Sequence, residues 1–380
     1  MIFSNGRVIL ADAIRGDLDI VIRDGTIAEL RPRKTAPNAI DLRGNFLAPG
    51  FVDLHVHGAL GRDAMEMSAD SFRAICDYHA RGGTTSLLLT TVTAEIEQIA
   101  SVLARVREFA AQIPQIAGAH VEGPFISAEK AGAQNPQFIR APVPELTDQL
   151  LGYADVIKRI TIAPEIKGGL PAIERFAAAR ISVSGGHSNA WDEEARAAFE
   201  RGMRSATHTF NCMSSARRRG IYRVAGLLEF ALGEPEMNCE LIADGHHVSP
   251  TLMQMAYRAK GAAGISLVTD ATAGAGLPDG TPFELGGKKC MVKNGVCVLA
   301  DQSALAGSAA SMIDLVRTMV RHVGVPLPQA VAMASSNPAR QIGLAKKGEI
   351  AAGNDADLIV FSPTFEVQQT FVAGERICAR

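Results

Sequence analysis

The chain has 380 residues, of which 47% are apolar, and a formal net charge of −2 at pH 7. This near balance of charge argues against a nucleic-acid partner, and the small number of aromatic side chains argues against a base-stacking surface. No apolar run reaches the length of a membrane span and no secretory signal is visible, so we expect a cytoplasmic protein with no membrane partner. The six cysteines form no C-x-x-C pair and are expected to be reduced thiols.

Both ends of the chain show strand and turn patterns. Alternating apolar residues flank Asp24-Gly25 in the stretch DIVIRDGTIAEL, which is typical of a β-hairpin. The last part of the chain also predicts strands and turns, without the apolar stripe of a helix. We therefore expect the two ends to pair into one small β-sandwich domain, formed by residues 1–48 and 347–380.

Residues 49–346 alternate short apolar runs with helix-compatible stretches. The runs that predict strands are 51–57, 84–91, 116–122, 160–165, 181–187, 205–210, 239–245 and 265–271. Between them, Ser71 is a candidate helix cap before a stretch that ends at Gly82, and a second stretch with an acidic first turn ends at Gly202. Eight such units predict an α/β fold, a (β/α)8 barrel of the TIM type, although periodicity alone leaves an open doubly wound sheet as an alternative.

Two histidines end the first predicted strand, in the stretch PGFVDLHVHG at 49–58. Residues i and i+2 share one face of a strand, so His55 and His57 present two imidazoles side by side, with Asp53 on the same face. A single histidine is more often a core or surface residue, but two on one strand face indicate a possible metal site.

Further candidate ligands stand at the ends of other predicted strands. They are Glu122 after the third strand, His187 after the fifth, His208 in the sixth and Asp270 at the end of the eighth. Taken alone, His187 would more often be a surface residue and His208 a core residue. A buried carboxylate, in contrast, is costly unless it is paired or bound to metal. Because active-site groups of a barrel come from the carboxyl ends of its strands, the set predicts a hydrolytic site for a divalent metal.

Several motifs follow one another along nearly the whole chain. They are PGFVDLHVHG, HVEGPFIS, KAGAQNP, GHSNA, ATHTFNCMS, LIADGHHV, LVTDATAGAG, LAGS and SNPARQIGL. In this order they resemble the N-acetylglucosamine-6-phosphate deacetylases of the amidohydrolase superfamily. The resemblance implies a barrel with a small β-sandwich, and removal of the acetyl group from N-acetylglucosamine-6-phosphate in amino-sugar catabolism. A deacetylase of the galactosamine epimer or another amidohydrolase acting on a small amide is the alternative; a non-enzymatic scaffold would have lost ligands that this chain keeps.

The resemblance also implies roles for the candidate ligands. Glu122, His187 and His208 match the ligands of the main metal ion, and Asp270 matches the catalytic aspartate. His55 and His57 match a pair that holds a second ion in some members, so one or two divalent ions are expected. Nitrogen and oxygen ligands suit Zn, Fe, Mn or Co.

The residues that the resemblance assigns to substrate binding are Ala133, Gln134, Asn211, Cys212, Arg219, His247, Leu305, Ala306 and Gly307. Arg219 best matches a phosphate-binding arginine by ungapped count, but a short insertion leaves Arg217 and Arg218 open, and a run of three arginines is usually a solvated face. In related enzymes the phosphate site draws on a neighbouring subunit, which implies a homodimer. Gln134 stands where the best-known members have a histidine. Unlike histidine, glutamine cannot carry a positive charge, so this difference leaves open whether the sugar is the glucosamine or the galactosamine epimer.

Overall fold

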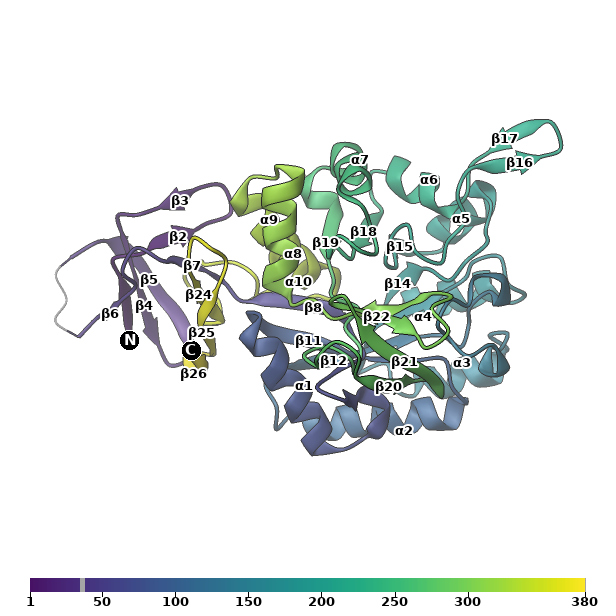
Figure 1. The fold of residues 1–380 in the computed structure, drawn as a ribbon, viewed down its shortest axis with the longest axis horizontal. Helices are drawn as coiled ribbons and strands as arrows, with labels where there is room; N and C mark the ends of the chain where they lie inside the picture. Colours follow the sequence, from purple (N-terminus) through teal and green to yellow (C-terminus); the bar gives the residue numbers. More distant parts are fainter. Residues whose placement is uncertain (35–37, 380) are drawn as a thin grey trace.

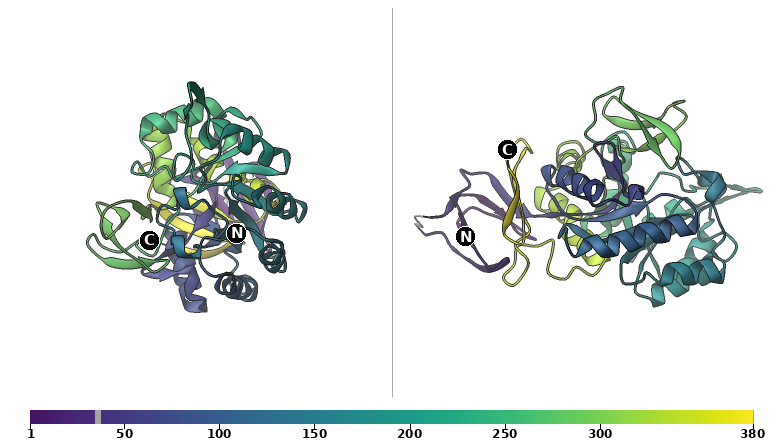
Figure 2. Two further views of the ribbon diagram at one scale, coloured as in Figure 1. Left: turned by 90° about the vertical axis from the view of Figure 1, so that its right-hand side faces the viewer. Right: turned by 90° about the horizontal axis from the view of Figure 1, so that it is seen from below.

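The computed structural model describes residues 1–34 and 38–379, so residues 35–37 and 380 of the predicted sandwich segments lie outside the described residues. The molecule has two parts that lie end to end (Figures 1 and 2). The smaller part consists of strands and holds both termini, and the larger part alternates strands and helices. The predicted domain boundaries themselves stay a prediction.

Eight parallel strands form a barrel in the larger part. In chain order, which is also their order in the sheet, they are β8 (Phe51–Val56), β11 (Thr84–Thr91), β12 (Ile116–Glu122), β13 (Ile157–Ile162), β14 (Ser182–Gly185), β15 (Met203–Ala206), β18 (Asn238–Leu241) and β19 (Ile265–Leu267). The ring closes where Val56 forms a β-bridge with Ala271, and the His57 N–H donates to the Ala271 carbonyl at 2.8 Å. The predicted barrel is therefore confirmed, and the open doubly wound sheet is excluded.

Some strands are shorter than the apolar runs that predict them. The runs at 205–210 and 239–245 continue past the observed strand ends at Ala206 and Leu241. The next residues stay buried without extending the ladder, and His208 adopts a left-handed backbone with φ of 30°. The apolar sequence therefore continues into loops that pack over the end of the barrel. These residues are apolar because they are buried, not because they pair in a strand.

Helices surround the barrel strands (Figure 2). They are α1 (Ala69–Arg81), α2 (Ile96–Ala110), α3 (Pro144–Leu151), α4 (Gly169–Ala178), α5 (Asp192–Glu200), α6 (Leu227–Gly233), α7 (Pro250–Lys260), α8 (Met312–Thr318), α9 (Leu327–Ala334) and α10 (Ser336–Gln341). The predicted cap at Ser71 is wrong: the Ser68 hydroxyl caps α1 by accepting from the Ser71 N–H, so the helix begins earlier. The helix over 192–200 has the predicted acidic first turn.

The smaller part contains two sheets. One is ordered β5-β4-β1-β6 and the other β26-β25-β24-β7-β2-β3. Their strands are β1 (Ile2–Ser4), β2 (Arg7–Ile9), β3 (Ile14–Arg15), β4 (Leu18–Arg23), β5 (Thr26–Pro32), β6 (Ile40–Asp41), β7 (Phe46–Pro49), β24 (Leu358–Phe361), β25 (Val367–Val372) and β26 (Glu375–Ala379). The predicted hairpin around Asp24-Gly25 is confirmed by β4 and β5, and β7 pairs with β24 from the other end of the chain. The sandwich from both termini is therefore confirmed.

Short strands that the sequence analysis did not predict are added to the barrel. An antiparallel meander consists of β20 (Pro282–Leu285), β21 (Lys288–Lys293), β22 (Val296–Leu299) and β23 (Leu305–Ser308). Two two-stranded sheets are formed by β9 (Gly58–Ala59) with β10 (Arg62–Asp63) and by β16 (Arg217–Arg219) with β17 (Tyr222–Val224). The β16–β17 hairpin projects from the barrel at the end opposite the sandwich (Figure 1).

Within the described part of the chain, none of the helices is both long enough and apolar enough to cross a membrane. The longest of the barrel helices, α2, has 15 residues, and a span of the hydrocarbon core needs about 20.

His79 on α1 makes the stability of this fold depend on pH. Its side chain is buried with Nε2 3.4 Å from the Gly58 carbonyl oxygen, and burial lowers its pKa to about 4. An unfolded chain protonates this histidine near pH 6.5, so the stability that neutral His79 contributes is present above pH 6.5 and is lost as the pH falls toward 4. At pH 5 the loss is about 2 kcal/mol.

Between pH 7.5 and pH 5 the wild type loses about 2 kcal/mol of unfolding free energy at His79, because this buried side chain resists protonation. We predict that His79→Gln, which keeps an N–H donor for the Gly58 carbonyl, does not show this loss. Denaturant unfolding at both pH values measures this difference. His322→Gln, at an exposed position, is the control and should follow the wild type. An equal loss in the wild type and His79→Gln would contradict the role of His79.

Candidate active site

The carboxyl ends of the barrel strands surround a cavity of about 200 Å³. The residues predicted for the site that line it are His57, Glu122, Ala133, Gln134, His187, His208, Asn211, Cys212, His247, Asp270, Leu305 and Gly307. Segments that are far apart in the chain thus meet at one rim, as parallel strands of a closed barrel require.

Three predicted residues do not line the cavity. His55 is fully buried directly behind it, with its ring in contact with the other ligand candidates. Ala306 is fully buried, and its carbonyl accepts from the Thr272 hydroxyl at 3.1 Å. Arg219 lies on the projecting hairpin, where it is exposed and forms an ion pair with Glu193.

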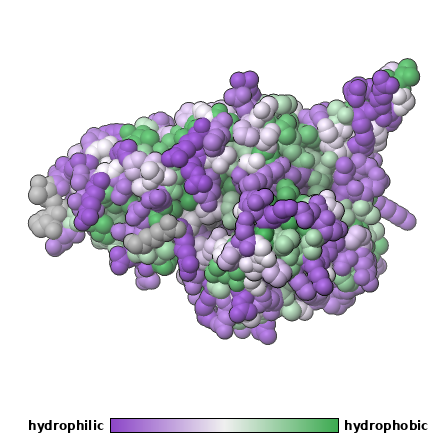
Figure 3. Space-filling model, viewed as in Figure 1, coloured by the Kyte–Doolittle hydropathy of each residue, from purple (hydrophilic) through white to green (hydrophobic). Residues whose placement is uncertain are grey.

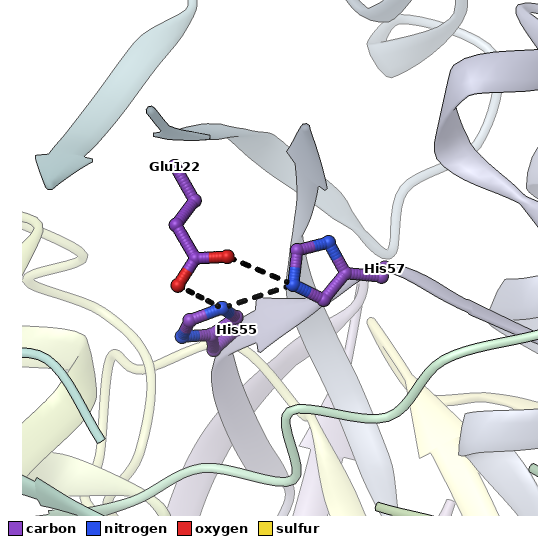
Figure 4. A group of neighbouring side chains, drawn as sticks. All are labelled: His55, His57 and Glu122. Carbon is purple, nitrogen blue, oxygen red and sulfur yellow. Dashed lines mark hydrogen bonds and ion pairs between the residues drawn. The ribbon is translucent and has the colours of Figure 1, made fainter. Parts of the chain in front are cut away.

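His55 on β8, His57 directly after that strand and the carboxylate of Glu122 on β12 form one group of possible ligands (Figure 4). The two Nε2 atoms of His55 and His57 are 3.2 Å apart. Glu122 places Oε1 3.4 Å from His55 Nε2 and Oε2 3.3 Å from His57 Nε2. Although β8 ends at Val56, the spacing of two residues still puts both rings on the same side, as the sequence predicts.

The same carboxylate belongs to a second group of possible ligands, with His187 after β14 and His208 after β15. Glu122 Oε1 lies 3.1 Å from His187 Nε2 and 3.0 Å from His208 Nε2. The two Nε2 atoms are 3.1 Å apart. His187 Nδ1 lies 2.8 Å from the Lys130 carbonyl oxygen, which fixes Nδ1 as the protonated nitrogen and leaves Nε2 to point at the group.

These residues fit a divalent metal ion. Ring nitrogens from four histidines and both oxygens of one carboxylate converge, and within each group of three the ligand atoms lie within 4.8 Å of one another. Lone pairs at such distances repel unless a proton or a cation lies between them. Nitrogen and oxygen donors in a buried, partly open site are typical of catalytic metal centres, and the shared Glu122 allows one ion or two.

Asp270 faces the same cluster from the segment that follows β19. Its Oδ1 lies 3.4 Å from His55 Nε2 and 3.3 Å from His57 Nε2. Burial alone would raise the pKa of Asp270, but these histidines outweigh burial and lower the pKa to about 2. Burial likewise opposes ionisation of Glu122, and His55 and His187 lower its pKa well below the usual range. Both carboxylates are therefore ionised at neutral pH.

Gln134 is bound to the cluster rather than pointing freely into the cavity. Its Nε2 donates to Glu122 Oε2 at 2.6 Å, and its Oε1 accepts from the Thr93 N–H at 2.7 Å. Both ends of the carboxamide are therefore engaged. Gly132, in the same loop, has φ of 56°, and a Cβ there would lie 2.5 Å from Cys212 Sγ, so only glycine fits.

The sequence analysis missed several residues of the cavity. Thr272, Leu285 and Ala304 line it without having been predicted. Asp244 Oδ2 lies 2.7 Å from His247 Nδ1 and so orients that ring toward the cavity with Nε2 foremost. The Asp-x-x-His spacing in LIADGHHV carried this signal, and Thr272 stands in the motif LVTDATAGAG. Leu285 and Ala304 come from segments with no distinctive pattern.

Comparison with known proteins agrees with this geometry. The model of the amidohydrolase family matches residues 46–377. An N-acetylglucosamine-6-phosphate deacetylase of Vibrio furnissii is 34% identical over 90% of this chain and 85% of its own length. An N-acetylgalactosamine-6-phosphate deacetylase of Escherichia coli O157:H7 is 32% identical over 97% of each chain.

Solved structures of N-acetylglucosamine-6-phosphate deacetylases match the fold of this chain over its whole length. A crystal structure of N-acetylglucosamine-6-phosphate deacetylase from Pasteurella multocida has a TM-score of 0.94 and 34% identity, covering 100% of this chain and 99% of that one. A point mutant of the Mycobacterium smegmatis enzyme, in complex with N-acetyl-D-glucosamine-6-phosphate, has a TM-score of 0.93 and 30% identity, covering 100% of this chain and 99% of that one.

The fold and the site define a hydrolase built on a barrel with a centre suited to a divalent metal. The chain belongs to the amidohydrolase family. The resemblance to the N-acetylglucosamine-6-phosphate deacetylases, which the sequence motifs predicted, is confirmed by the relatives and the solved structures.

We predict that Glu122→Gln binds less than about one tenth of the divalent metal held by the wild type, because it removes the charge shared by both groups of ligands. Metal analysis after dialysis against buffered Zn²⁺ measures this content. Glu129→Gln, which alters an exposed carboxylate after the same strand, is the control. A metal content equal to that of the wild type would remove Glu122 from the ligand set.

Proposed function

We propose that this chain hydrolyses N-acetylglucosamine-6-phosphate to glucosamine-6-phosphate and acetate, as a step of amino-sugar catabolism. The single observation that carries the proposal is the convergence of four histidines and Glu122 with Asp270 at the wall of one cavity. That arrangement suits hydrolysis of an amide, and the relatives that match almost the whole chain carry this activity in their names.

Amide hydrolysis needs an activated water, a polarised carbonyl and a proton for the departing amine. Glu122, His187 and His208 would hold a divalent ion, which would supply a water of lowered pKa, toward about 7, and polarisation of the acetyl oxygen. In our proposal the Asp270 carboxylate takes a proton from the attacking water and then gives it to the nitrogen that leaves. The Asp270 carboxylate is ionised at neutral pH, and its Oδ1 lies beside the Nε2 atoms of His55 and His57, within the cluster.

The second group of ligands, His55 and His57 with Glu122, supports the proposal of a second ion. Both histidines are present, and their Nε2 atoms lie 3.4 Å and 3.3 Å from the two oxygens of Glu122. We propose a two-ion centre of Zn, Fe, Mn or Co, since all four metals suit nitrogen and oxygen donors. Which of them is bound often depends on the supply of each metal in the cell.

The contacts we assign to the sugar come from the remaining wall of the cavity. Ala133, Asn211, Cys212, Leu305 and Gly307 lie there, and small side chains and exposed backbone groups allow a sugar to approach closely. His247, oriented by its Asp-x-x-His partner, offers Nε2 to the phosphate. Ala306 packs behind this wall. Gln134 influences the site through its hydrogen bond to Glu122.

The phosphate requires a cation from outside the cavity. Among the described residues that line the cavity there is neither a lysine nor an arginine. The β16–β17 hairpin carries Arg219 and further arginines on an exposed projection, and its tip is apolar, with Ile221 85% and Tyr222 70% exposed (Figure 3). We propose a homodimer in which this hairpin packs against the partner subunit and brings an arginine to its phosphate.

Three positions of the hairpin compete for this role. Arg217 stacks on the Trp191 ring and donates to the Asn189 carbonyl, which ties it to its own chain. Arg219 lies over the same Trp191 ring but farther from it, 4.7 Å from the ring centroid against 3.7 Å for Arg217, and among the described residues its guanidinium donates to no backbone carbonyl. Its partner Glu193 forms an exposed ion pair that contributes little and is easily exchanged. Arg219 therefore stays our candidate for the phosphate, with Arg218 beside it.

The galactosamine epimer is the second candidate substrate, because one relative at 32% identity is named for it. Acetate release from both epimers of the N-acetylated sugar phosphate, and from the unphosphorylated sugar, tests the proposal. Release that requires the phosphate supports it, and the ratio of the two epimers names the sugar. If metal-loaded protein releases no acetate from any of them, the substrate is wrong.

The six cysteines are free thiols. This agrees with a reducing compartment, and we propose the cytoplasm as the location of the protein.

We predict that Asp270→Asn lowers kcat for acetate release by at least about 100-fold, because an amide cannot transfer the proton. Its metal content should stay close to that of the wild type, since the ligand groups are unchanged. Turnover and metal analysis on one preparation separate the two effects. Wild-type turnover in this variant would exclude Asp270 from proton transfer.

Mixing two inactive variants tests the dimer. One variant carries Asp270→Asn, and the other carries Arg218→Ala with Arg219→Ala. If the hairpin acts on the partner subunit, co-expressed chains regain about one quarter of the wild-type activity, because half of the dimers are mixed and each has one complete site. An arginine that acts within its own chain would give no recovery.

A further inference from the structure

A buried ion pair lies inside the barrel behind the metal ligands. Arg159 on β13 and Glu240 on β18 are both fully buried, with Nε and Oε1 2.7 Å apart. The other guanidinium nitrogens reach the hydroxyls of Ser182, Ser184 and Ser205. Replacing a buried ion pair by apolar residues of similar volume is often neutral or stabilising, so fold stability alone does not account for this one.

The second oxygen of Glu240 touches both groups of ligands from behind. Oε2 lies 3.5 Å from His55 Nδ1 and accepts from the His208 backbone N–H at 3.1 Å. The opposite nitrogen of the same ring, His55 Nε2, faces Glu122 and Asp270. The carboxylate therefore sits on the reverse side of the His55 ring from the cluster, and Arg159 occupies the other oxygen.

We propose that Glu240, held by Arg159, is a positioning residue that keeps the proton of His55 on Nδ1, so that Nε2 presents its lone pair to the second divalent ion. This inference rests on the proposed function in one respect, since it takes His55 as a ligand. A neutral imidazole carries one proton, and the group that accepts from one nitrogen decides which nitrogen is free to bind metal. Arg159 fixes the carboxylate by engaging Oε1 and leaves Oε2 for the ring.

Glu240→Gln tests the inference because its carboxamide is not symmetric. The guanidinium of Arg159 attracts the carbonyl oxygen, so the NH2 group turns toward His55 and favours the tautomer with the proton on Nε2. Metal-free full-length chain titrated with Zn²⁺ against a chromophoric chelator gives the affinity of each ion. We expect the wild type to bind two ions, and the variant to bind the second about 10- to 100-fold more weakly while the first changes less.

If Glu240→Gln alone does not fold, two double variants keep the test valid. In both of them Arg159 is also replaced, so no buried guanidinium is left without its carboxylate partner. Arg159→Met with Glu240→Gln leaves a carboxamide that is free to turn its oxygen toward His55. Arg159→Met with Glu240→Leu leaves no acceptor. The leucine variant should bind the second ion about 10- to 100-fold more weakly than the glutamine variant.

Asp357→Asn is the control, because it removes a buried carboxylate charge that is paired with the partly exposed Lys347 at the sandwich, away from the metal ligands. It should leave both affinities unchanged. Equal second-ion affinity in the two double variants, or only one ion per wild-type chain, would overturn the inference. Acetate release by the same wild-type preparation tests the proposed function independently. The wild type can release acetate whether or not Glu240 affects the affinity for the second ion.

Discussion

The closed ring of parallel strands is the constraint on which the site depends. It forces the carboxyl ends of all eight strands to one rim, so residues that follow different strands become neighbours whatever their separation in the chain. Glu122 at the end of β12 contacts ligand candidates at the end of β8 and in the turns after β14 and β15. One carboxylate thereby joins two groups of three possible ligands.

This convergence requires backbone conformations that most residues avoid. His187, His208 and Asp270 have φ values of 45°, 30° and 50°. Each left-handed residue costs about 1–3 kcal/mol and persists only where the surroundings fix it. The Asp270 N–H donates to the His55 carbonyl at 2.9 Å, and the Ser308 N–H donates to the Asp270 carbonyl at 2.8 Å. Strain at the rim is thus offset by hydrogen bonds that close the barrel.

Residues behind the ligands give the cluster its orientation. Gln134 holds one oxygen of Glu122, and the Lys130 carbonyl holds the ring of His187. In our inference Glu240 does the same for His55 from inside the barrel. Such contacts use polar groups that are buried and must be paired, so a ligand and its support form one network.

The sequence by itself determined the succession of the eight barrel strands, the sandwich from both termini and the strand-end positions of the ligand candidates, because these follow from periodicity and chain order. Only the tertiary structure decided which neighbours face the cavity: Leu305 and Gly307 line it while Ala306, between them on β23, points away, since side chains alternate along a strand. It also placed Arg219 on a projecting hairpin, which a residue count along the chain could not foresee. Local pattern sets the elements, but long-range packing sets what each side chain meets.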